Sequence, residues 1–98
     1  MKIFLDTAVY EDIEKANQSG LIDGVTTNPS LILKSGGDPV ETIRRISGDF
    51  PFFESISAEV VADNALEMVD QAQAFKDMQN VTIKVPLTVE GLKACKLL

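Results

Sequence analysis

The chain has 98 residues, of which 45% are hydrophobic and 24% charged, the balance of a small globular domain rather than of a disordered segment. Its net charge of −6 argues against a general nucleic-acid-binding surface, and no apolar stretch is long enough to span a membrane, so we expect neither partner. Histidine is absent and the single cysteine cannot form an internal disulfide, which fits a reducing cytoplasm and leaves proton transfer to carboxylates, lysine, tyrosine or water.

The first quarter of the chain predicts two short strands separated by a helix. A strand over residues 2–6 ends in a carboxylate, and a second strand is predicted over residues 21–26. Between them, residues 11–16 predict a helix, because acidic side chains come early and a lysine comes late. Gly20 is expected to close that helix as its C-terminal cap.

Two consecutive helix starts are predicted in the next segment. Asn28 is a favoured N-cap and Pro29 fits the first helical position, so a short helix begins there and breaks at residues 35–37. A second helix is expected to begin at Asp38, with Glu41 at the position that a capping box requires.

The second half repeats the alternation of strand and helix. Strands are predicted over residues 56–61 and 81–86, the first followed by a helix capped by Asp63 or Asn64, and the second by a helix capped by Thr88. Apolar residues at helical spacing mark the expected core faces of the helices: Ile43, Ile46, Ala65, Met68, Val69, Ala72, Phe75, Val89 and Leu92.

Four strand–helix units in succession predict an α/β fold with a parallel sheet and helices outside it. Units of about 20–30 residues match those of a TIM (β/α)8 barrel or a doubly wound sheet. Four units are half of the eight that close a barrel, and the chain ends inside its last helical pattern. We therefore expect residues 1–98 to form one domain, a parallel (β/α)4 half-barrel. Such a half-barrel is either a fragment or buries its open edges against another copy.

One polar residue accompanies each predicted strand, in or just after its apolar run: Asp6, Asn28, Glu59 and Lys84. The C-terminal ends of parallel strands are where catalytic groups gather in such sheets. Simpler roles stay open for each residue. Asp6 and Asn28 are favoured helix caps, and Glu59 can form a structural ion pair with Lys84.

Lys84 is the most informative of the four, because it stands in a run rich in β-branched residues that predicts a buried strand. A buried, unpaired ammonium is costly, so a lysine there is expected to lose its proton or to find a carboxylate. A neutral lysine amine attacks carbonyl carbons and forms a Schiff base. The alternative is an edge-strand lysine that only prevents unwanted strand pairing.

Four segments, taken together and in this order, resemble the transaldolases. The similarity runs along the whole chain and is greatest to the small subfamily that also contains the fructose-6-phosphate aldolases. The matching segments are FLDTA at residues 4–8, GVTTNPSL at residues 24–31, SAEV at residues 57–60 and IKVP at residues 83–86.

This resemblance implies class I aldolase chemistry on a (β/α)8 barrel, with no metal or organic cofactor. Lys84 would form the Schiff base with a ketose-phosphate donor. Asp6 would take the proton from the donor hydroxyl as the carbon–carbon bond breaks, and Glu59 would work through a water in forming and hydrolysing the imine. The three-carbon unit would then pass to an aldose phosphate, the transaldolase reaction of the pentose phosphate pathway.

The resemblance also implies substrate contacts. Asn28 would hydrogen-bond the bound dihydroxyacetone unit, and Thr26 and Ser57 would contact substrate or water. Glu59 favours transaldolase, because the fructose-6-phosphate aldolases carry glutamine at this position. Full members of the family are roughly twice this length, as a complete barrel requires. The serine and the arginines that hold the sugar phosphate in them have no counterpart here, so a catalytically silent, self-associating half-barrel is the other alternative.

Overall fold

The computed structural model describes residues 1–98 and contains one parallel sheet with the strand order β1-β2-β3-β4. The strands are β1 (Phe4–Asp6), β2 (Gly24–Thr26), β3 (Ser55–Glu59) and β4 (Val81–Lys84). The helices are α1 (Tyr10–Ser19), α2 (Pro29–Lys34), α3 (Pro39–Asp49), α4 (Ala65–Ala72), the 3-10 helix η1 (Gln73–Phe75) and α5 (Val89–Leu97). None of these helices is both long and apolar enough to cross a bilayer.

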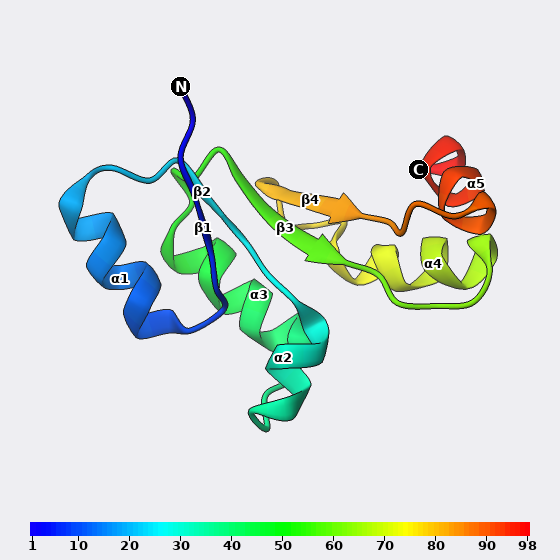
Figure 1. Cartoon of the computed structure of the whole chain (residues 1–98), viewed down its shortest axis with the longest axis horizontal. Helices are drawn as coiled ribbons and strands as arrows, with labels where there is room; N and C mark the ends of the chain where they lie inside the picture. Colours follow the sequence, from blue (N-terminus) through cyan, green and yellow to red (C-terminus); the bar gives the residue numbers. More distant parts are fainter.

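In Figure 1 the strands fan out from β1 to β4, with α1 beside β1 and with α4 and α5 beyond β4. The short helix α2 lies at the ends of the first two strands, where the chain leaves β2. The predicted α/β class and the parallel (β/α)4 arrangement of a partial barrel are therefore confirmed.

Strand pairing divides the sheet into two chemically different faces. Side chains alternate along a strand, so residues at the same register position point to the same side. Leu5, Val25, Ile56 and Val81 form one row of neighbours on the first face. The next row, Asp6, Thr26, Ser57 and Thr82, points to the opposite face.

The hydrophobic core lies on the first face, against the helices. One cluster joins Val25 and Ile56 of the sheet to Ile13 of α1 and Ile46 of α3, all four at most 1% exposed. A second cluster lies beneath the ends of β3 and β4, where α4 packs against α5. Its buried members are Val60, Ala65, Met68, Ala72 and Ala94.

Most of the predicted helix ends are confirmed. The side chains of Asn28, Asn64 and Thr88 accept hydrogen bonds from backbone N–H groups in the first turns of α2, α4 and α5. Gly20 ends α1 with a φ of 72°, a conformation that glycine adopts without steric cost.

The predicted capping box at the start of α3 is wrong. Asp38 precedes the helix, but its side chain makes no capping hydrogen bond. Both Asp38 and Glu41 are exposed, so water can satisfy the free N–H groups of this first turn. Pro39 still sets the backbone of the first helical residue.

The expected core face of α5 is also wrong. Val89 and Leu92 are 70% and 58% exposed, whereas Gly91 and Ala94 are buried. Close packing explains the difference, because a Cβ on Gly91 would collide with the carbonyl oxygen of Pro86. The helix therefore packs through its smallest residues and leaves its larger ones on the surface.

Gly24 provides a direct test of the strand packing. A Cβ there would collide with the carbonyl oxygen of Ser55 and would lie 2.6 Å from the Phe4 ring. We expect Gly24→Ala to lower the free energy of unfolding by about 1–3 kcal/mol, as overpacking does, measured by urea denaturation. The control is Gly48→Ala, at an exposed position of α3 with open space around it, which should stabilise the chain by up to about 1 kcal/mol. Equal stability of the Gly24 variant and the unmodified chain would contradict this account.

Candidate active site at the C-terminal edge of the sheet

Polar side chains gather at one edge of the sheet, as the sequence predicts. Asp6, Glu59 and Lys84 are the last residues of β1, β3 and β4. Asn28 lies two residues beyond β2, at the start of α2. Because all four strands run in parallel, these positions share the C-terminal edge.

Five of the six candidate residues also share one face. Asp6, Thr26 and Ser57 belong to the row opposite the core face, and Glu59 and Lys84 form the next row on that side. None of the five belongs to a hydrophobic cluster. The packing of the sheet therefore gathers carboxylates, hydroxyls and an amine on the side that faces away from the core.

Asp6 and Thr26 are in direct contact across the first two strands. The hydroxyl of Thr26 donates to Oδ1 of Asp6 over 2.8 Å. Asp6 is exposed and Thr26 is half-buried, so the more buried side chain holds the more exposed one. This bond orients the carboxylate and leaves its second oxygen free to accept a proton.

Glu59 and Lys84 face each other across β3 and β4 at the same register position. Neighbouring strands lie about 4.8 Å apart, so the two residues start close together. Their side chains nevertheless form no ion pair, and the structural pairing considered for Glu59 is wrong for this chain.

The expectation that the strand of Lys84 is buried is wrong as well. β4 alternates half-buried and exposed residues, and Lys84 is exposed. The reason is that β4 is the outermost strand of the sheet and has β3 as its only neighbouring strand. Lys84 therefore stands on an edge strand, as the alternative role of preventing unwanted strand pairing requires. It also lies opposite Glu59 in the strand register.

Asn28 serves as a helix cap in this structure. Its Oδ1 accepts from the N–H of Ser30 at 2.9 Å and from that of Leu31 at 3.4 Å. The side-chain NH2 group has no protein partner and the residue is exposed. Capping thus occupies the oxygen and leaves the nitrogen free to donate to a ligand.

Open grooves flank this edge of the sheet. Glu59 lines two of them, of about 550 and 440 Å³, the first reaching Thr88 before α5 and the second reaching Pro29 of α2. Asp6 lines a third groove of about 390 Å³, bordered by Leu31. Lys84 lines none of these grooves, so the six candidate residues share the C-terminal edge, and five of them one face, but they line no common cavity.

Of the four groups with a resolved pKa shift, Lys2, Tyr10 and Asp77 lie away from this edge, whereas Glu90 at the start of α5 shares a groove with Glu59. A hydrogen bond from Arg44 holds the pKa of Asp77 below its usual value. A hydrogen bond to Asp49 raises the pKa of Tyr10, whose ring lies 3.9 Å below the guanidinium of Arg45. Both arginines are thus engaged on the outer surface of α3 rather than at the strand ends.

Thr82 is a polar neighbour that the sequence analysis did not single out. It lies on the same face as Lys84, and its hydroxyl is 2.6 Å from that of Ser55. The alternation of apolar and polar residues in β4 would have revealed it, because Thr82 and Lys84 are two positions apart.

A family model described as Transaldolase/Fructose-6-phosphate aldolase matches residues 3–98. A curated protein named probable transaldolase from Mesorhizobium japonicum is 52% identical over 97 residues, which cover 98% of this chain and 44% of the relative. Proteins with the same name from Roseobacter denitrificans and Nitrosopumilus maritimus are 48% and 47% identical, each over 100% of this chain and over 45% and 44% of their own length. The chain thus spans less than half the length of these curated relatives.

The capping role of Asn28 can be tested by its effect on stability. We expect Asn28→Ala to lower the free energy of unfolding by about 1 kcal/mol, because two N–H groups lose their acceptor. Asn28→Ser keeps a capping oxygen and should cost only a few tenths of a kcal/mol. Thermal unfolding followed by circular dichroism measures both. Equal midpoints for the alanine variant and the unmodified chain would rule out a stabilising cap.

Proposed function

Because the chain belongs to the Transaldolase/Fructose-6-phosphate aldolase family, we propose that it carries the Schiff-base-forming part of a class I aldolase site. One observation carries the proposal: Lys84, Glu59 and Asp6 end three parallel strands on one face of the sheet. That arrangement combines an amine with two carboxylates, which covalent catalysis of this kind uses as nucleophile and as proton-transfer groups.

The first step is formation of the imine. The neutral amine of Lys84 attacks the carbonyl carbon of a ketose phosphate and gives a carbinolamine. Loss of water from the carbinolamine requires a proton for the departing hydroxyl, and Glu59 supplies it through a bound water. The position of Glu59 beside Lys84 in the strand register supports this role. The product is a protonated imine, which draws electrons more strongly than the ketone.

The second step is cleavage of the carbon–carbon bond. Asp6 removes the proton from the hydroxyl on the carbon that becomes an aldehyde. The bond to the neighbouring carbon breaks, and its electron pair moves into the protonated imine to form an enamine. The hydrogen bond from Thr26 supports this role by holding the Asp6 carboxylate in one orientation.

The last steps transfer the retained three-carbon unit. The enamine carbon attacks the aldehyde of an aldose phosphate, and Asp6 returns the proton to the new hydroxyl. Water then hydrolyses the imine and releases Lys84. Asn28 and Ser57 bind the dihydroxyacetone unit or its water. The free NH2 group of Asn28 supports this, because it can donate to a substrate hydroxyl while the oxygen caps α2.

We further propose a sugar-phosphate substrate, a place in the pentose phosphate pathway and a cytoplasmic location. The matched relatives named probable transaldolase and the carboxylate at Glu59 favour transaldolase over fructose-6-phosphate aldolase. The lone cysteine fits a reducing compartment. Assays with and without an acceptor aldehyde separate the two activities, because an aldolase releases the three-carbon product without an acceptor.

Trapping of the imine tests the proposal. We expect borohydride reduction in the presence of fructose 6-phosphate to leave a mass adduct on Lys84, located by peptide mass spectrometry. Lys84→Met should abolish the adduct and keep the fold, because Lys84 is exposed and makes no salt bridge. The matched control is Lys96→Met, at an exposed lysine of α5, which should keep the adduct.

Absence of any adduct at millimolar substrate would show that this chain is a catalytically silent fragment. Unfolding of the Lys84→Met variant would instead reveal a structural lysine. The two failures are separated by the circular dichroism spectrum of each variant.

We also propose that the chain self-associates through the open edges of the half-barrel. β1 and β4 each have one unpaired side, and unpaired strands favour association. Exposed apolar residues lie in or next to both outer strands, with Ile3 and Phe4 at β1 and Leu87 in the segment that follows β4. Light scattering after size-exclusion chromatography should give a mass above that of one chain. A stable monomer at every concentration tested would contradict this proposal.

A further inference from the structure

The register of β4 on β3 decides which side chain lies beside Lys84. In the observed register Lys84 faces Glu59, and Thr82 faces Ser57. Val81 and Ile83 are half-buried on the core side, and the polar residues of β4 point the other way. A one-residue slip would turn Lys84 toward the core, so the hydrophobic pattern opposes it.

The same pattern does not oppose a two-residue slip. Ile83 would take the place of Val81 and Val85 that of Ile83, which exchanges one branched apolar residue for another. Lys84 would stay on the polar face but would lie opposite Ser57. Pro86 would end the strand, and an edge strand tolerates proline there. The alternation therefore fixes the face of Lys84 but not its neighbour.

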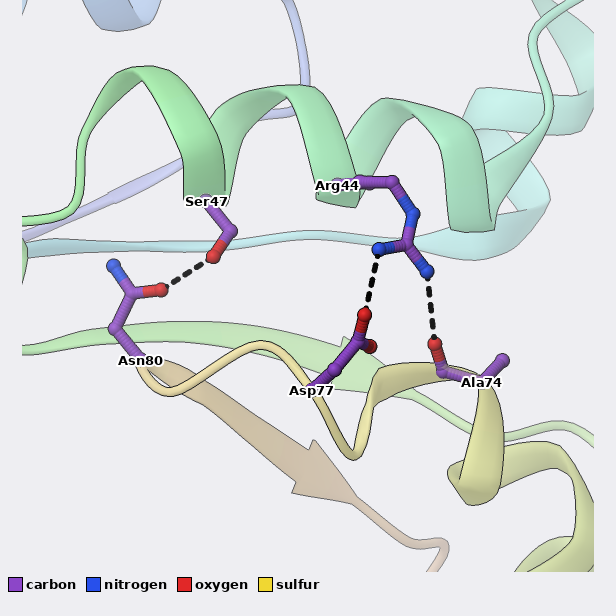
Figure 2. Close-up of polar contacts among 5 residues, drawn as sticks. All are labelled: Arg44, Ser47, Ala74, Asp77 and Asn80. Atoms are coloured by element: carbon purple, nitrogen blue, oxygen red, sulfur yellow. Dashed lines mark hydrogen bonds and ion pairs between the residues drawn. The ribbon is translucent and has the colours of Figure 1, made fainter.

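The side chain of Asn80, directly before β4, makes contacts that depend on the register. The hydroxyl of Ser47 in α3 donates to Oδ1 of Asn80 over 2.6 Å, as Figure 2 shows. Nδ2 of Asn80 donates to the carbonyl oxygens of Phe50 at 3.0 Å and of Phe53 at 3.4 Å. Three hydrogen bonds thus join one half-buried side chain to α3 and to the turn that follows it.

The groups that hold Asn80 are themselves fixed relative to β3. Phe50 and Phe53 are 4% and 3% exposed, and their rings stack with centroids 5.0 Å apart. β3 begins at Ser55, two residues after Phe53. A slip of two residues would move Asn80 by about 6.6 Å along the strand, out of reach of all three partners.

We propose that Asn80 is a positioning residue for Lys84, because its side chain selects the register that places Lys84 opposite Glu59. The effect on chemistry rests on the proposed function, in which Lys84 is the reactive amine. The effect on register does not, and it can be measured without substrate.

Arg44 and Asp77 offer a control in the same region. Figure 2 shows Arg44 reaching from α3 to Asp77, in the turn before β4, and to the carbonyl oxygen of Ala74 in η1. The Arg44–Asp77 pair spans 3.0 Å, but its side chains are 48% and 61% exposed. Exposed ion pairs contribute little, so we assign register selection to the half-buried Asn80 and not to this pair.

Cross-strand NOEs in the isotopically labelled chain test the proposal. The unmodified chain should show contacts between backbone protons of Glu59 and Lys84. Asn80→Ala removes all three side-chain bonds. Asn80→Asp keeps the acceptor for Ser47 but sets a carboxylate oxygen against two carbonyls. In both variants we expect a second set of NOEs, between Ser57 and Lys84, which reports the register slipped by two residues. The population of this slipped register should rise about tenfold, because the half-buried hydrogen bonds of Asn80 are lost.

Two matched controls should keep only the native NOEs. Gln79→Ala changes an exposed neighbour of Asn80, and Asp77→Asn weakens the exposed ion pair. Native NOEs of undiminished intensity in Asn80→Ala, with no second set, would overturn the proposal. So would equal slippage in the Asp77 variant. If Asn80→Ala fails to fold, Ser47→Ala, which removes only one of the three bonds, gives the same comparison.

The borohydride adduct then separates register from chemistry. If the unmodified chain forms an adduct on Lys84, Asn80→Ala should lose it in proportion to its loss of native NOEs, while Gln79→Ala keeps it. An undiminished adduct in a slipped strand would overturn the positioning role. Absence of an adduct in the unmodified chain would count against the proposed function alone, because the NOEs still report the register.

Discussion

The alternation of side chains along four parallel strands is the constraint on which the rest of this structure depends. One set of positions supplies Val25, Ile56 and their neighbours, which pack against the helices. The other set supplies Asp6, Thr26, Ser57, Glu59 and Lys84. The same strands therefore supply both the core and the candidate site, and the two differ only in the face of the sheet to which the side chains point. The core can hold the strands together without occupying the polar face.

The two ends of the sheet make different contributions. At the C-terminal edge, the polar side chains other than the buried Ser57 are exposed or half-buried, and Thr26 and Asp6 share a hydrogen bond. At the other end, Asn80 connects the start of β4 to α3 and to a turn held by stacked aromatic rings. Hydrogen bonds at the start of β4 can therefore set the positions of side chains at the C-terminal ends of the strands, although these bonds lie far from any substrate.

The Lys84 amine is open to solvent in this chain, whereas a lysine that forms a Schiff base is expected to be shielded from water. A lysine becomes more nucleophilic when its surroundings disfavour the ammonium form, and exclusion of water is one way to achieve this. Lys84 is exposed on an edge strand, and the chain spans 44–45% of the relatives cited above. Asp6 and Glu59 lie on the same face of the sheet as Lys84, whereas residues 1–98 leave the amine open to water.

Local sequence signals were sufficient for much of the fold. Asn28 and Thr88 were identified as caps, and Asn64 as one of two candidates beside Asp63, because a cap depends only on the next few backbone N–H groups. The capping box at Asp38 failed because solvent competes for those groups at an exposed helix start. The core face of α5 failed for another reason. Its packing depends on how closely Gly91 can approach Pro86, a distance between elements that no helical periodicity encodes.

The sequence by itself determined the strand–helix order, the strand that carries each candidate residue and the family to which these segments are similar. Those properties follow from periodicity and from short segments that can be read locally. Only the tertiary structure decided that Lys84 is exposed, that it lies opposite Glu59 without an ion pair, and that Thr26 holds Asp6. These depend on the register and on the position of each strand in the sheet, which are set by contacts between residues far apart in the chain.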